Sequence, residues 1–210
     1  AHYRARLENE TALLRQWFAD DALSPTCDIG GFEIEACLVD ASCRPAPVNT
    51  DLLQRLDDPL VVPELSRFNV EINTPPQPLH GAALRDMHAD LTRRWRRCQR
   101  AAQTLNTELL VAGILPTLLD RDLTLEHMSP VERYRALNEQ VLRLRQDDPI
   151  TLDIQGRDHL HTRHHDVMLE AAATSLQIHL QLPPARSVRY YNSAMILSAP
   201  LLAVSANSPY

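Results

Sequence analysis

The 210-residue sequence lacks the features that several protein classes require. No run of apolar residues reaches the roughly 18 needed to cross a bilayer. The chain starts with the charged segment AHYRARLENE rather than with the apolar core of a signal peptide. A cytoplasmic protein with no membrane partner is therefore expected. Basic residues number 21 against 27 acidic ones, and the formal net charge of −6 argues against a nucleic-acid partner.

Cysteine and glycine are also scarce. The four cysteines lack the CxxC spacing of a zinc site and form no evident disulfide framework, so reduced, mostly structural thiols are expected. They are Cys27, Cys37, Cys43 and Cys98. Only 5 glycines are present, and no internal repeat or low-complexity tract interrupts the chain. Because 44% of the residues are hydrophobic, one sizeable core is feasible. The sequence predicts a single domain over residues 1–210, with 1–27 as an N-terminal helical extension.

The spacing of apolar residues predicts both helices and strands. Apolar residues three or four apart indicate helices over residues 3–20, 81–109, 130–144 and 188–204. Alternating apolar residues, or a short apolar run, indicate strands over residues 31–40, 67–73, 110–115 and 175–182. The mixture predicts an α+β fold, in which an antiparallel β-sheet is backed by helices on its apolar face.

Three of these strands share an unusual polar face, which carries acidic, amide or imidazole groups and no Lys or Arg. Its residues include Glu33, Glu35, Glu71, Gln177 and His179. For any single strand, a solvated face is the simpler interpretation. Carboxylates at positions i and i+2, however, lie only about 7 Å apart and repel one another unless a cation lies between them. Mg²⁺ prefers oxygen ligands and is usually held together with substrate phosphates, so the pattern favours nucleotide chemistry.

Five motifs, in the same order along the chain, resemble glutamate–cysteine ligase family 2, which includes general carboxylate–amine ligases. They are GFEIE at 31–35 followed by VD at 39–40, NVEINTPP at 69–76, GILP at 113–116, QIH at 177–179 and SANSP at 205–209. The resemblance spans roughly residues 28–209, and five motifs in series are far more specific than one Glu-x-Glu strand. It implies a glutamine-synthetase-like sheet. Since family members are typically about twice as long, it also implies an N-terminal half with an incomplete sheet and site.

The resemblance further implies an activity. In this family ATP phosphorylates a substrate carboxylate, and an amine then displaces phosphate from the acyl phosphate to form an amide. Glutamate and cysteine are the expected small-molecule substrates, and γ-glutamylcysteine, an intermediate of glutathione biosynthesis, is the expected product. A ligase for another acid and amine, or a non-catalytic or regulatory module of the same fold, remains an alternative. A homo-oligomer is compatible with each of these.

The resemblance also assigns roles to individual residues. Glu33, Glu35, Glu64, Glu71 and His179 are the expected magnesium site. Of these, Glu33, Glu71 and His179 are the expected catalytic residues, with His179 near the metal and phosphates. The arginines Arg133 and Arg135 could clamp the phosphates of ATP or a substrate carboxylate. The simpler interpretation places both arginines on the solvated side of a helix.

Two other features could indicate a functional site, but a simpler structural explanation is expected for each. A dense histidine group matches no zinc-site spacing, and the neighbouring Gly156 and Asp158 predict a solvent-facing loop that could also cover the substrate. Its members are His159, His161, His164 and His165. Cys37 lies on the polar side of the first predicted strand, but an acidic environment raises the pKa of a thiol. A structural thiol is therefore expected at Cys37.

Overall fold

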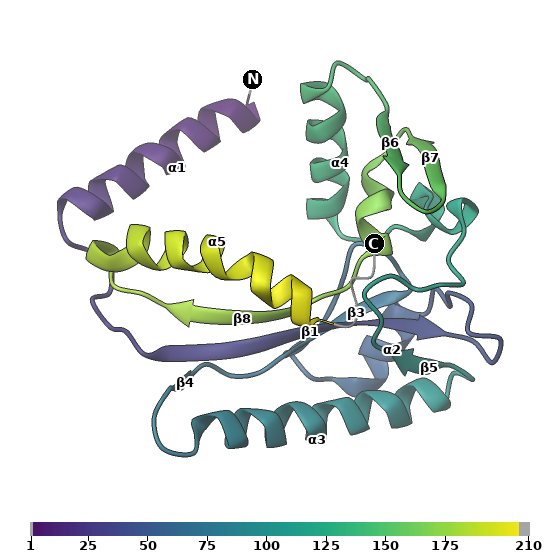
Figure 1. The fold of residues 1–210 in the computed structure, drawn as a ribbon, viewed down its shortest axis with the longest axis horizontal. Coiled ribbons are helices and arrows are strands. Elements are labelled where there is room, and N and C mark those ends of the chain that lie inside the picture. The colour runs from purple at the N-terminus through teal and green to yellow at the C-terminus, as the bar shows by residue number, and fades with distance from the viewer. Residues whose placement is uncertain (1, 206–210) are drawn as a thin grey trace.

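A computed structural model describes residues 2–205 of the protein (Figure 1). The centre of the molecule is a six-stranded sheet in which all strand pairs are antiparallel. Its strands are β1 (Ile29–Val39), β2 (Val61–Pro63), β3 (Asn69–Asn73), β4 (Gln77–Pro78), β5 (Glu108–Leu110) and β8 (Leu176–Gln181). A separate hairpin is formed by β6 (Ile150–Gln155) and β7 (His159–His164). The fold is α+β with an antiparallel sheet and helices, as predicted. Its relation to the glutamine-synthetase-like sheet stays a prediction.

Strand β1 organises the sheet because it pairs with four other strands. On one side it pairs with β3, so that Glu35 lies opposite Glu71. On the other side it pairs with β8, so that Glu33 lies opposite Gln177. Since side chains alternate between the two faces of a strand, this register brings the polar residues of three strands to one face.

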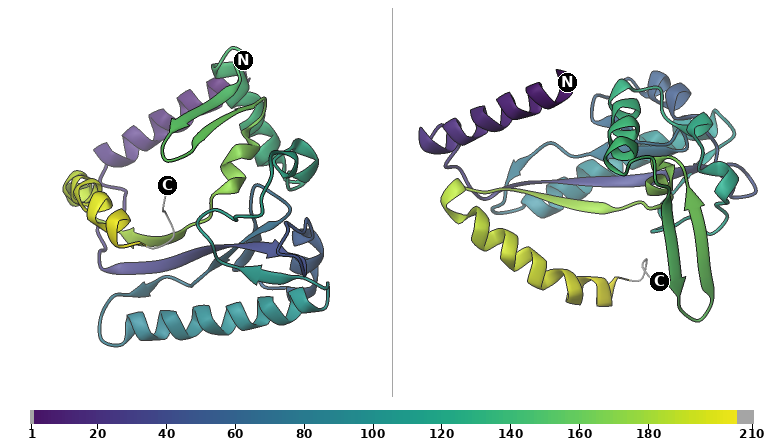
Figure 2. Two further views of the ribbon diagram at one scale, coloured as in Figure 1. Left: turned by 45° about the vertical axis from the view of Figure 1, so that its right-hand side comes forward. Right: turned by 90° about the horizontal axis from the view of Figure 1, so that it is seen from above.

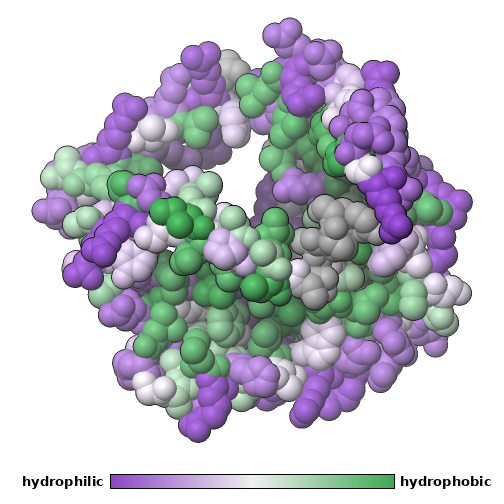
Figure 3. Space-filling view, viewed as in Figure 1, coloured by the Kyte–Doolittle hydropathy of each residue, from purple (hydrophilic) through white to green (hydrophobic). Residues whose placement is uncertain are grey.

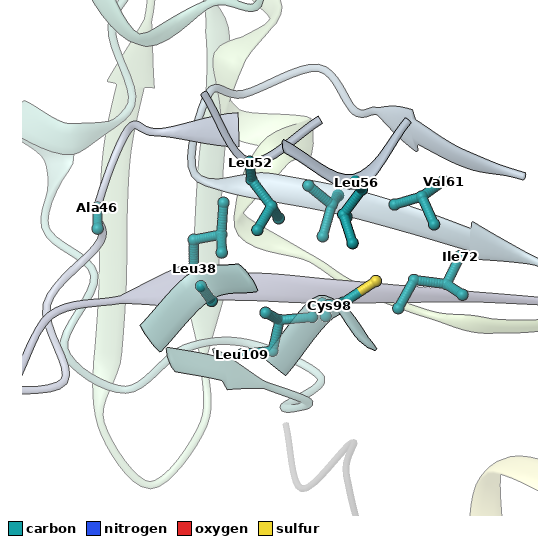
Figure 4. Packing of buried hydrophobic residues seen from close by; sticks show 11 residues of the cluster. Leu38, Ala46, Leu52, Leu56, Val61, Ile72, Cys98 and Leu109 are labelled. Atoms are coloured by element: carbon teal, nitrogen blue, oxygen red, sulfur yellow. The ribbon is translucent and has the colours of Figure 1, made fainter. Parts of the chain in front are cut away.

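Two helices cover the other face of the sheet. The five α-helices of the described residues are α1 (His2–Ala19), α2 (Asn49–Leu56), α3 (Ala83–Gln103), α4 (Glu132–Leu144) and α5 (Ser187–Val204). Helices α2 and α3 pack on β1 and β3, and Leu38, Leu52, Ile72 and Cys98 are fully buried between them (Figure 4). This cluster is the main core, and it supports β1 from behind the polar face.

The predicted backing of the apolar face by helices holds for β1, β3 and β5 but not for β8. Leu176 and Ile178 are 60% and 65% exposed. Apolar side chains of α5 are also exposed, and they gather on the face seen in Figure 3. Helix α1 forms as predicted, but its apolar residues are exposed along its length. The assignment of residues 1–27 as an extension of a single domain stays a prediction.

Two predicted boundaries were wrong. The helix predicted over 81–109 ends at Gln103, and the strand expected over 110–115 is instead β5 at Glu108–Leu110. The cause is a tight turn at Asn106, whose φ of 56° lies in the left-handed region.

Of the SANSP motif, only Ser205 falls within the described residues. Over those residues, no helix combines the length and the hydrophobicity needed to cross a membrane.

The histidine-rich loop predicted over 159–165 was also wrong. His159–His164 form strand β7, paired residue by residue with β6. Gly156 and Asp158, which suggested a loop, belong to the turn of this hairpin, where the Gly156 backbone N–H donates to the Asp158 carbonyl at 2.9 Å. The expected exposure is found for His159, His161 and His165, whereas His164 is buried.

Replacing Leu52 with alanine should test the main core. Leu52 is fully buried, so we expect Leu52→Ala to lower the free energy of unfolding by about 2–5 kcal/mol through lost burial and a residual cavity. The matched control Leu84→Ala, at an exposed position of α3, should change it by less than about 0.5 kcal/mol. Denaturant unfolding measures both variants, and equal losses would contradict this packing.

Candidate metal and phosphate site

Four carboxylates gather on the face of the sheet that points away from α3. Glu33 and Glu35 come from β1, Glu71 from β3, and Glu64 from the turn that follows β2. Glu35 is the direct cross-strand neighbour of Glu71, and such pairs have Cβ atoms about 4.5–5.5 Å apart. Within residues 2–205, no arginine forms an ion pair with any of the four. The face therefore concentrates negative charge, with the imidazole of His179 against Glu33 as its basic neighbour.

Strand β8 supplies hydrogen-bond partners to Glu33. The Gln177 side-chain amide donates to Glu33 Oε1 at 2.5 Å and to Glu35 Oε1 at 3.2 Å. His179 Nε2 lies 2.9 Å from Glu33 Oε2. The pairing of β8 with β1 thus joins Glu33, Gln177 and His179, three of the residues that the sequence placed on polar strand faces.

Glu35 and Glu71 have partners of their own. Ser175 donates to Glu35 through its backbone N–H at 3.0 Å and its hydroxyl at 2.9 Å. The Asn73 side-chain amide donates to Glu71 Oε1 at 2.5 Å. Neutral donors fix the direction of a carboxylate while leaving its charge uncompensated, and this suits a metal ligand.

Burial and mutual repulsion raise the affinity of this face for protons. Burial raises the pKa of Glu64 to about 7, and the charges of Glu35 and Glu71 act in the same direction. A hydrogen bond from the Leu65 N–H opposes this shift. Burial, followed by the charge of Glu71, also raises the pKa of Glu33 above its usual range. A bound cation would offset the repulsion that contributes to both shifts.

Three cavities open beside the carboxylates. Glu35 and Glu64 line one of about 330 Å³, and Glu33 and His179 line one of about 310 Å³. Glu71 lines a third of about 450 Å³. Each is large enough for a phosphate group or a small acid, so the acidic face is accessible to ligands.

The two candidate arginines occupy different environments. Arg133 lines the cavity beside Glu71, and its guanidinium lies 4.7 Å from the ring centre of Tyr134. Its hydrogen bond to the Tyr134 hydroxyl raises the Arg133 pKa, and the charges of Glu64 and Glu71 act in the same direction. Arg135 is exposed and pairs with Glu132 at 3.4 Å. The structure brings Arg133 to the site and leaves Arg135 outside it.

A buried amide fixes the turn that carries Glu64. The Asn49 side-chain amide, at the start of α2, donates to the carbonyls of Ser66 and Asn69 at 3.1 Å each and to the Ser129 hydroxyl at 2.9 Å. The Ser129 hydroxyl in turn donates to the Glu64 carbonyl. Because buried polar groups require partners, this network locks the backbone from Glu64 to Asn69 in place.

Sequence patterns did not nominate some residues at the site. Asn73 and Ser175 hold carboxylates, and their positions on the polar faces of predicted strands were the available signal. Tyr134 and Glu170 line the cavity beside Glu64, and no spacing in the sequence connects them with the strands. Cys37 is buried, and this burial is the main reason that its pKa is raised to about 11. Both observations fit the expected structural thiol.

The four carboxylates fit Mg²⁺ in their chemistry, but they are too far apart for three of them to hold one ion. Their donor atoms are carboxylate oxygens, which this ion prefers. Among residues 2–205, no three of these carboxylates bring ligand atoms within 4.8 Å of one another. The arrangement therefore suits ions held by one or two carboxylates each, with positions left for phosphate oxygens and water, as is usual for Mg²⁺.

The fold and the acidic face define an α+β protein with a candidate site for metal and phosphate. The family model of glutamate–cysteine ligase family 2 matches residues 29–210, and the chain belongs to this family. Membership implies a ligase that joins a carboxylate to an amine. No curated protein and no solved structure matches the chain.

Replacing Glu64 with glutamine should change how stability depends on pH. Because the Glu64 pKa is raised from 4.5 to about 7 on folding, its favourable contribution is present below pH 4.5 and is lost as the pH rises through 7. Discounted for solvent exposure, Glu64→Gln should raise the free energy of unfolding by about 1–2 kcal/mol at pH 8, relative to its effect at pH 4.

Denaturant unfolding without divalent metal, at both pH values, measures this difference. The control Glu108→Gln alters an exposed carboxylate of β5 and should show no such change with pH. An effect of Glu64→Gln that is the same at pH 4 and pH 8 would contradict the raised pKa.

Proposed function

We propose that the chain carries the metal-binding and phosphate-binding part of an ATP- and Mg²⁺-dependent carboxylate–amine ligase. The observation that supports this most strongly is the set of four carboxylates on one sheet face, held by amide, hydroxyl and imidazole groups and unpaired with arginine within residues 2–205. Membership of glutamate–cysteine ligase family 2 supports the ligase class. Glutamate and cysteine are the proposed substrates, and a cytoplasmic location, where ATP is supplied, belongs to the same proposal.

Each residue of the site has a proposed role. Glu33, Glu35, Glu64 and Glu71 would hold Mg²⁺, which when bound neutralises the phosphates of ATP. His179 and Gln177 orient Glu33, while Ser175 orients Glu35 and Asn73 orients Glu71. His179 lines a cavity with Glu33, so it is also placed to donate to a phosphate oxygen there.

The reaction brings two anions together. An oxygen of the substrate carboxylate bonds to the γ-phosphorus while the bond from that phosphorus to the ADP oxygen breaks. The amine nitrogen then attacks the acyl carbon, loses a proton, and phosphate leaves. Alignment and charge neutralisation are the main tasks of such a catalyst. Arg133 is the proposed contact for a phosphate or for the substrate carboxylate, because it faces the cavity beside Glu71.

Release of ADP by the full gene product, across a panel of acids and amines, tests this function. With Mg²⁺ and ATP, glutamate together with cysteine should stimulate ADP release more than any other pair. Stimulation by a different pair would retain the ligase and change the substrates. If no pair stimulated release, the proposed function would be wrong.

Substitutions at the metal face provide the control for this assay. Glu71→Gln and Glu33→Gln each remove an anionic ligand at nearly constant volume, so turnover should fall by at least about 100-fold with little change in the fold. Glu139→Gln changes an exposed carboxylate on α4 and should retain full turnover. Wild-type turnover in either metal-face variant would overturn the assignment of these ligands.

A further inference from the structure

The hairpin of β6 and β7 gathers a second set of metal-capable side chains, outside the acidic face. Asp153, His159 and His161 each present one ligand atom, and these atoms lie within 4.8 Å of one another. His159 Nε2 lies 2.6 Å from Asp153 Oδ1, and His161 Nδ1 lies 3.7 Å from Asp153 Oδ2. All three side chains are about half exposed or more, so an ion from solution can reach them.

The strand register explains why they converge. Asp153 on β6 lies directly opposite His161 on β7, whereas His159 lies opposite Gln155 and therefore diagonal to Asp153. Residues at i and i+2 of a strand share a face, which places both imidazoles on the side of Asp153. The hairpin projects away from the main sheet (Figure 2), and hydrophilic side chains cover it (Figure 3).

The chemistry of this set differs from that of the acidic face. Two imidazoles and one carboxylate suit a borderline transition-metal ion such as Zn²⁺ better than Mg²⁺. Ligand bonds of about 2.0–2.2 Å in a tetrahedron place ligand atoms roughly 3.3 Å apart. One ligand atom of each side chain already lies within 4.8 Å of the other two, so the three need only draw closer together to reach this spacing. A water molecule would fill the fourth position.

The surrounding charges limit the strength of such a site. Arg163 shares the strand face two residues after His161, where it lies opposite Thr151. In the turn, Asp158 adds a second negative charge to that of Asp153, and Arg157 adds a second positive charge to that of Arg163. The local charge is therefore close to balanced, and affinity depends on direct coordination by the three ligands rather than on a general attraction for cations.

We propose that Asp153, His159 and His161 form a binding site for one divalent transition-metal ion, with Zn²⁺ as the representative case. The ligands come from both strands, so the ion would link β6 to β7. This site is independent of the proposed ligase chemistry.

Calorimetric titration of Zn²⁺ into the metal-free full chain, at pH 7.5 and with excess Mg²⁺, tests the proposal. We expect one Zn²⁺ per chain, and at least tenfold weaker binding in His159→Ala and in His161→Ala. The matched control His80→Ala alters an exposed histidine far along the chain from the hairpin and should bind as the wild type does. Circular dichroism checks that each variant is folded.

Bound Co²⁺ gives a second readout, since its visible spectrum reports nitrogen coordination, and this spectrum should weaken in both hairpin variants. Zn²⁺ binding that survives in His159→Ala and His161→Ala would assign the ion to thiols or to the acidic face, and it would overturn the proposal. Absence of Zn²⁺ binding by the wild-type chain would overturn it as well. Neither result would affect the proposed ligase function.

Discussion

Repulsion between carboxylates on one face of the sheet is the constraint on which the rest of the structure depends. Glu35 and Glu71 are cross-strand neighbours, and Glu64 approaches both of them closely enough for their charges to raise its pKa. A folded protein tolerates such a group only if protons, donors or a cation offset the charge. Here the nearby donors include amide and hydroxyl groups, which direct the carboxylates without cancelling their charge, and the imidazole of His179 lies beside Glu33.

Strand β1 carries this charge because its opposite face is firmly packed. Leu38 is fully buried against α2 and α3, and Cys37 is buried on the other side, near the end of the strand. Asn49 links the start of α2 to the turn that holds Glu64. The core thus reaches the site directly, through α2 and its buried amide, and keeps mutually repelling groups at fixed positions.

The polar face could be predicted from sequence because alternation along a strand is a local property. Glu33, Glu71 and His179 belong to three strands that each reveal their own period, and pairing with β1 then brings them together. The position of Arg133 at the cavity, with Arg135 outside it, depends on how α4 sits on the sheet, and no local pattern encodes that.

Other elements escaped prediction for physical reasons. Helix α2 has only eight residues, too few for a clear period. The β6–β7 hairpin was mistaken for a loop because the turn residues Gly156 and Asp158 outweighed the alternation on either side. Exposure of Leu176 and Ile178 on β8 could not be foreseen, because an alternating strand predicts a buried apolar face whether or not another layer covers it.

The most direct test of the central claim is calorimetric titration of Mg²⁺ with a non-hydrolysable ATP analogue into this chain. We expect binding that requires both Mg²⁺ and the analogue, that disappears in Glu33→Gln and that persists in Glu126→Gln, which alters an exposed carboxylate. Absence of binding by the wild-type chain, or binding of equal strength in Glu33→Gln, would contradict the assignment of the acidic face to metal and phosphate.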